Sequence, residues 1–183
     1  MAVKILVDVW LLIALAIHVC TIVFAVASVA GPYWMDGPVA HFGLWNYCYE
    51  YVSATHSDKC YQITDVDGFD VDGYFRGIQV FMCMGCIITL VTFLLIFGLI
   101  FMLVRQDNRK YALFVTVIVC FIQGMLLFTG CVMFLSQKEK YAGVQMSADW
   151  AHYLAWVACC CSFIAACFLV VHYALNREVY EEL

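Results

Sequence analysis

The chain has few of the charged residues with which a soluble protein covers its surface. Only 13% of its 183 residues are charged, whereas an average soluble domain has about 25%. Lysine and arginine number 9 against 14 aspartates and glutamates, so there is little positive charge to bind nucleic acid phosphates. Only two prolines are present, which argues against a linker-rich chain. These shortages exclude a cytosolic enzyme, a disordered regulator and a protein with a nucleic acid partner.

Catalytic and phosphate-binding patterns are missing as well. The chain contains no Gly-x-Ser-x-Gly, no His-Glu-x-x-His and no glycine-rich phosphate loop. His41, His56 and His152 are scattered over the predicted loops, and the Cys83-Met-Gly-Cys86 pair lies in an apolar segment without a second pair of ligands. We therefore predict that the protein is not an enzyme and holds no cofactor and no metal.

What the chain has in excess is apolar sequence. Hydrophobic side chains make up 66% of it, and its mean hydropathy is +0.91. A membrane-spanning helix needs roughly 20 apolar residues, and four uncharged runs reach that length: 10–30, 78–104, 111–135 and 153–175. Because lipid offers no hydrogen-bond partner to the backbone, such runs must be helices. The sequence predicts an integral membrane protein that is mainly α-helical, with four transmembrane helices.

The basic residues predict the orientation of these helices. Five of the nine lie in three short segments: Lys4, Arg105, Arg109, Lys110 and Arg177. Segments rich in Lys and Arg stay in the cytoplasm. We therefore expect one four-span domain over 1–183, with cytoplasmic segments 1–9, 105–110 and 176–183, and extracellular loops 31–77 and 136–152.

The first outer loop contains a strand pattern. Trp45, Tyr47, Tyr49 and Tyr51 alternate with smaller side chains, so they fall on one face of a strand, and a short strand returns near 61–64. This tyrosine face is a candidate interaction surface.

Cys48 and Cys60 are the only cysteines of the chain outside the four apolar runs, and the two strands bring them within reach of each other. A disulfide closing this loop of about 13 residues would contribute roughly 3 kcal/mol of stability. The alternative is a pair of free thiols.

A set of residues in this loop resembles a family signature. Trp34, the tripeptide Gly43-Leu44-Trp45, the cysteines Cys48 and Cys60, and then Arg76 resemble the W-GLW-C-C pattern of the claudin superfamily. That superfamily comprises claudins, peripheral myelin and epithelial membrane proteins, the lens fibre membrane intrinsic protein and some channel and receptor subunits. The resemblance implies a left-handed four-helix bundle beneath a small antiparallel extracellular sheet from the first outer loop.

The signature residues are interpreted as a structural anchor. Indole rings are favoured at the headgroup level of a membrane, so we expect Trp34 and Trp45 to rest there and hold the sheet on the outer leaflet. The resemblance implies that Arg76 braces the base of the sheet through carbonyls or a carboxylate.

Four carboxylates follow in two copies of Asp-Val-Asp-Gly: Asp65, Asp67, Asp70 and Asp72. Oxygen-rich loops suit Ca²⁺, but the spacing is not that of an EF-hand. A calcium site, an acidic surface that attracts cations and a pair of solvated turns all remain open, and the last is favoured.

Two polar side chains, His18 and Gln123, lie inside predicted spans. Such residues often mark functional sites, but we interpret these two as hydrogen-bonding across the bundle. Ala158, Ser162 and Ala166 recur every fourth residue, a stripe that allows close helix packing.

The favoured function is a claudin-like structural protein of cell–cell contacts in the plasma membrane. Its outer sheet would self-associate in cis and in trans, contributing to adhesion and to the paracellular barrier. The alternatives are an accessory subunit of a channel or receptor and a membrane organiser of the myelin type. The terminal Tyr180-Glu-Glu-Leu183 leaves a PDZ scaffold partner open, and the chain has no Asn-x-Ser/Thr glycosylation site.

Overall fold

The structure is a computed structural model of the whole chain. It describes the residues 9–49, 59–65, 71–101, 108–142 and 146–176, without the side chains of 138–142. Of the predicted site residues, Tyr51, Asp67 and Asp70 lie outside these residues, as do the basic residues Lys4, Arg105 and Arg177 and the terminal segment 180–183.

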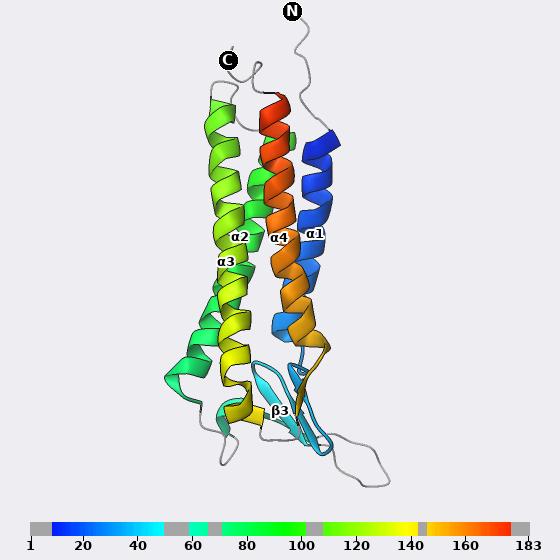
Figure 1. Cartoon of the computed structure of the whole chain (residues 1–183), viewed down its shortest axis with the longest axis vertical. Coiled ribbons are helices and arrows are strands. Elements are labelled where there is room, and N and C mark those ends of the chain that lie inside the picture. The colour runs from blue at the N-terminus through cyan, green and yellow to red at the C-terminus, as the bar shows by residue number, and fades with distance from the viewer. Residues whose placement is uncertain (1–8, 50–58, 66–70, 102–107, 143–145, 177–183) are drawn as a thin grey trace, which may run out of the picture.

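Four long helices run side by side (Figure 1), and their bounds are α1 (Val9–Ala30), α2 (Gly73–Ile100), α3 (Arg109–Ala142) and α4 (Trp150–Leu175). The shortest has 22 residues, which at 1.5 Å per residue is about 33 Å and exceeds the hydrocarbon thickness of a bilayer. All four are long and apolar enough to cross a membrane. The protein is a multi-pass membrane protein with the predicted number of spans.

The helices form a ring in which each packs on two neighbours. α1 packs on α2 and α4, and α3 packs on the same two helices. The outward faces are apolar: Val19, Leu90, Phe121 and Ile164, one from each helix, are all more than 40% exposed. An apolar outer face around a bundle is what lipid tails require.

Three helices extend beyond the predicted spans at the sheet end: α2, α3 and α4, the last of which begins at Trp150 instead of at 153. α2 begins at Gly73 instead of at 78, because the Asp72 carboxylate caps it by accepting the N–H of Phe75 at 2.8 Å. α3 continues to Ala142, past the predicted span end at 135. Helix propensity and capping set these ends, whereas hydropathy marks only the part of a helix that lies in lipid.

A five-stranded sheet lies at one end of the bundle, opposite the start of α1 and the end of α4 (Figure 1). Its order is β4-β3-β2-β1-β5, and all described neighbours are antiparallel. The strands are β1 (Met35–Asp36), β2 (Ala40–Phe42), β3 (Asn46–Tyr49), β4 (Lys59–Gln62) and β5 (Ser147–Ala148).

One strand corrects the prediction. The sheet was expected to come from the first outer loop alone, but β5 belongs to the segment between α3 and α4 and pairs with β1 through Met35 and Ala148. Strand β4 is followed by a short 3₁₀ helix, η1 (Ile63–Asp65), so the returning strand ends earlier than predicted. The sheet therefore joins both loops at this end of the molecule.

The core beneath the sheet connects it to the helices. Phe42 of β2, Phe75 of α2 and Phe134 of α3 are all completely buried, and they belong to one cluster. Trp34, between α1 and β1, lies in the same cluster. Burying an aromatic side chain contributes roughly 1.5–3 kcal/mol, so this cluster holds the sheet on the bundle.

Close packing of α2 on α3 gives the first prediction. A Cβ added at Gly85 would lie 2.6 Å from Cδ2 of the buried Leu127, whereas a Cβ at Gly98 on the same helix would meet nothing within 4 Å. We expect Gly85→Val to lower the free energy of unfolding by about 1–3 kcal/mol through overpacking. Chemical unfolding in detergent micelles, followed by circular dichroism, measures the change. The matched control Gly98→Val should unfold like the unmodified protein, and equal stability of the two variants would contradict this packing.

Candidate functional site

The C-terminal end of α1 is the point at which the sheet is attached. The last carbonyls of a helix have no partner within it, and three of those at the end of α1 are met from outside. The N–H of Gly31 donates to the Ala27 carbonyl at 2.9 Å. The indole Nε1–H of Trp34 donates to the Ser28 carbonyl, and that of Trp45 donates to the Val29 carbonyl, each at 2.8 Å. Two indoles therefore cap neighbouring carbonyls of one helix end.

Trp34 is a core residue. Its side chain is completely buried, and its ring makes edge contacts with the rings of Phe134 and His152 at centroid distances of 4.8 and 5.2 Å. The expectation that Trp34 rests among lipid headgroups is therefore wrong, because the sheet and the helices enclose the ring. Trp45 differs: its indole N–H is bonded to the Val29 carbonyl, but 39% of the residue's surface is exposed. Of these two tryptophans, only Trp45 has an exposed side chain.

The glycine of the Gly43-Leu44-Trp45 tripeptide is required by a close approach. A Cβ at Gly43 would lie 2.8 Å from Cα of Pro32 and would press against the carbonyl of Gly31. Leu44, the next residue, is completely buried. The tripeptide thus combines a backbone contact, a buried anchor and a helix cap in three consecutive positions.

The base of the sheet is connected to α2 by a residue that the sequence analysis did not single out. The Gln79 side-chain amide donates from Nε2 to the Leu44 carbonyl at 2.6 Å. Arg76, for which this role was expected, has an exposed side chain in the first turn of α2. No described residue supplies a hydrogen bond or ion pair to its guanidinium. An amide at the second position of the apolar run 78–104 is the sequence signal that pointed to Gln79.

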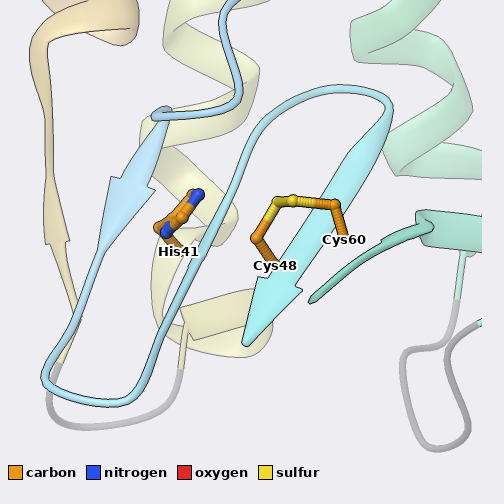
Figure 2. A group of neighbouring side chains, drawn as sticks. All are labelled: His41, Cys48 and Cys60. Carbon is orange, nitrogen blue, oxygen red and sulfur yellow. A yellow bond between two sulfur atoms is a disulfide. The ribbon is translucent and has the colours of Figure 1, made fainter. Parts of the chain in front are cut away.

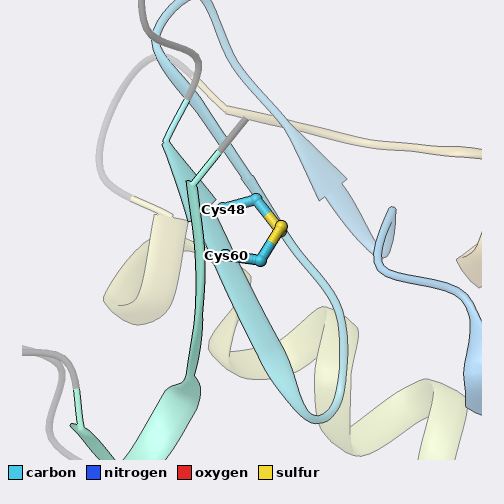
Figure 3. The surroundings of a disulfide bond; sticks show 2 residues. All are labelled: Cys48 and Cys60. Carbon is cyan, nitrogen blue, oxygen red and sulfur yellow. A yellow bond between two sulfur atoms is a disulfide. The ribbon is translucent and has the colours of Figure 1, made fainter. Parts of the chain in front are cut away.

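The predicted disulfide is present. Cys48 and Cys60 are directly opposite each other in the β3–β4 pair and are joined through their sulfurs (Figure 3). β4 lies at the edge of the described sheet, so the disulfide ties this edge strand to its neighbour. The cross-link limits how far the exposed end of the sheet can deform.

His41 lies beside the disulfide (Figure 2), opposite Cys48 in the β2–β3 pair. Its ring is buried and stacks on the Tyr33 ring at a centroid distance of 4.0 Å. The potential ligand atoms of His41, Cys48 and Cys60 lie within 4.8 Å of one another. A thiolate is the form of cysteine that binds metal, and both sulfurs are occupied in the disulfide. The group as it stands offers a metal only the imidazole.

The predicted tyrosine face begins in the core and ends at the surface. Tyr47 is half-buried against Phe42, whose ring is nearly parallel to it at 5.9 Å. Burial, with a smaller contribution from the nearby Tyr49, raises the pKa of the Tyr47 phenol, so it stays neutral. Tyr49 and Tyr61 lie farther out, with 38% and 47% of their surfaces exposed and their rings 6.3 Å apart. Tyr61 was not among the predicted residues.

The acidic repeat is described only at its two ends. The Asp65 carboxylate accepts a hydrogen bond from the Thr64 hydroxyl at 3.1 Å. Asp72 is the cap of α2. The end carboxylates thus have local structural partners, and the calcium hypothesis stays an untested prediction.

The segment from Gly31 to Trp34 also holds the start of α4. The Tyr33 carbonyl accepts the N–H of Ala151, and the Trp34 carbonyl accepts the N–H of Asp149, each at 3.1 Å. The first N–H groups of a helix lack intrahelical partners. The Tyr33 carbonyl is such a partner for the N–H of Ala151. The end of α1, the sheet and the start of α4 therefore form one connected unit.

A comparison with protein families agrees with these features. A model of the PMP-22/EMP/MP20/Claudin family matches residues 7–169 of the 183-residue chain. The matched part begins just before α1 and ends within α4, so it contains the indole caps, the disulfide and the whole sheet. Comparison with curated proteins found no match.

The indole caps give the second prediction. Trp45→Phe removes one donor and should lower the free energy of unfolding by about 0.5–1.5 kcal/mol, the net value of a hydrogen bond. Trp34→Phe leaves the Ser28 carbonyl without its partner inside the protein and should cost more, about 1–3 kcal/mol. Chemical unfolding in detergent measures both.

The matched control is Trp150→Phe. Trp150 is 43% exposed, and its indole N–H donates to no described atom. We expect this variant to unfold like the unmodified protein. A Trp45→Phe protein as stable as Trp150→Phe would show that the cap does not hold the sheet.

Proposed function

The chain belongs to the PMP-22/EMP/MP20/Claudin family, and on that basis we propose that it is a structural protein of cell–cell contacts. In this proposal the sheet lies outside the cell and associates with other copies, side by side and across the gap between two membranes. The association contributes to adhesion and to the paracellular barrier. Proteins of this family are structural membrane proteins and are not typically enzymes.

The observation that carries the proposal is an exposed aromatic surface on a braced sheet. We define the tyrosine edge as Tyr49 and Tyr61, which are exposed on the two strands joined by the disulfide. Tyrosine is enriched in protein interfaces. Because the disulfide and the indole caps already order this edge, binding costs less conformational entropy than it would for a loose loop.

The proposed orientation places the sheet outside and the opposite end of the bundle in the cytoplasm. Arg109 and Lys110 begin α3 at the end opposite the sheet. Basic residues favour the cytoplasmic side. Both termini are then cytoplasmic, and so are 180–183, which lie outside the described residues and where a PDZ scaffold partner would bind.

A second candidate function, an accessory subunit of a channel or receptor, is favoured by a different surface. Two apolar grooves of about 490 and 650 Å³ lie between α3 and α4 and share Val117 and Val170. Grooves of this kind on an outer helix face can receive a helix of a partner. Under this candidate the contact is made within the membrane and does not need the tyrosine edge.

The third prediction tests the first function. The protein, tagged at both termini, is expressed in cells that form no junctions of their own. We expect enrichment where two expressing cells touch, increased aggregation of suspended cells, and tags that antibodies reach only after permeabilisation. The double variant Tyr49→Ala with Tyr61→Ala should lose most of the enrichment while keeping its surface level.

The control for this experiment comes from the same two strands. Asn46 and Gln62 are an exposed cross-strand pair in the same strands, and Asn46→Ala with Gln62→Ala should leave contact enrichment unchanged. A uniform surface signal without aggregation would contradict the contact function. Co-purification of the tagged protein with one channel from the same cells would support the accessory function instead.

A further inference from the structure

The helices have several buried polar side chains, Thr21 of α1 and Thr92 of α2 among them. One from each helix lies in the middle of the bundle at a shared level: His18 of α1, Thr89 of α2, Gln123 of α3 and Ser162 of α4, and none of these is more than 1% exposed. We call this set the central polar layer. Polar groups at this depth have no access to bulk water, so their hydrogen bonds must be found inside the protein.

Helix pairing places the four residues at one level. Gly85 of α2 faces Leu127 of α3, as the close approach of an added Cβ to that side chain shows. The two helices are antiparallel (Figure 1). Thr89 is four residues after Gly85 and Gln123 is four residues before Leu127, about one turn in each case, so helix geometry places Thr89 and Gln123 at the same level.

The other two helices join at the same level. His18 Nε2 lies 3.0 Å from the Thr89 carbonyl, which connects α1 to α2. The Ser162 hydroxyl donates to the Cys120 carbonyl at 2.9 Å, one turn from Gln123, which connects α4 to α3. His18 and Gln123 come from helices on opposite sides of the ring, so the layer crosses its centre.

Two members of the layer are satisfied. Besides the Ser162 bond, the Thr89 hydroxyl donates to the Gly85 carbonyl at 2.8 Å. Since a carbonyl can only accept, His18 Nε2 carries the ring proton, and Nδ1 of the neutral ring is an acceptor. No described atom forms a hydrogen bond with His18 Nδ1, or with Oε1 or Nε2 of Gln123.

The chemistry of these three atoms limits what can bind them. The ligand must donate to the imidazole Nδ1, accept from the amide N–H₂ and donate to the amide oxygen. A lipid tail can neither donate nor accept a hydrogen bond, so it meets none of these requirements. A metal cation would meet no carboxylate here, because the described carboxylates that could serve, Asp36, Asp65, Asp72 and Asp149, belong to the sheet end. Water donates and accepts at once, and buried waters typically make about three hydrogen bonds.

We propose that the central polar layer is a binding site for internal water, which bridges His18 Nδ1 to the side-chain amide of Gln123 and so links α1 to α3 across the bundle. The bridge joins the α1–α2 bond of His18 to the α3–α4 bond of Ser162, so that hydrogen bonds connect all four helices in series. A polar layer of this kind fixes the register of helices, since any slip leaves its members without partners in lipid. The inference does not depend on the proposed contact function.

The test is nuclear magnetic resonance of the whole protein in micelles, with ¹⁵N in glutamine side chains and histidine rings. We expect magnetisation transfer between long-lived water and the Gln123 amide protons, together with a His18 ring protonated at Nε2 and hydrogen-bonded at Nδ1. Absence of any water transfer to Gln123 overturns the proposal. A direct coupling between the Gln123 amide and His18 Nδ1 overturns it as well, because the two side chains would then meet without water.

A variant arm tests whether the two residues share the water. Gln123→Met keeps the side chain's volume and removes both polar atoms, and we expect the His18 Nδ1 resonance to move toward that of an unbonded imidazole nitrogen. The control Ser28→Ala removes a buried hydroxyl near the end of α1 and should leave the His18 resonances in place. An Nδ1 resonance that is the same in Gln123→Met and in the unmodified protein overturns the shared site.

Discussion

The carbonyl groups at the end of α1 are the constraint on which the sheet depends. A helix that ends at a membrane surface leaves carbonyls that neither lipid nor the helix can satisfy. Here the donors are the indoles of Trp34 and Trp45, placed on either side of a hairpin. Each indole brings its own part of the loop to the helix end, Trp34 just before β1 and Trp45 just before β3. Satisfying one helix therefore positions the first three strands of the sheet.

The remaining connections make the sheet a single unit with the bundle. Gln79 ties the loop to α2, β5 extends the sheet with residues from between α3 and α4, and the Tyr33 carbonyl receives a backbone N–H of α4. The disulfide then secures the edge strand β4. Tyr49 and Tyr61 therefore lie on a sheet that is connected to α1, α2 and α4. A surface ordered in this way before binding suits association between copies.

Much of this arrangement was predictable because hydropathy, alternation and cysteine position are local signals. The number of spans, the strand at Asn46–Tyr49 and the Cys48–Cys60 pair follow from them. The sequence did not predict β5, since two small residues at 147–148 carry no alternation. It misplaced Trp34, because a tryptophan beside a span has the same local pattern whether it faces lipid or a covering sheet. Gln79 was missed because its partner is a backbone carbonyl 35 residues away.

The most direct measurement of the central claim is hydrogen exchange at the indole nitrogens of the oxidised protein in micelles. If Trp34 and Trp45 cap α1, their Nε1–H signals exchange slowly with solvent deuterium. The indole of Trp150, at the same end of the bundle and without a described acceptor, exchanges quickly and serves as the internal reference. Rapid exchange of the Trp45 indole, at the rate of Trp150, would contradict the account, because the sheet would then be attached without its second cap.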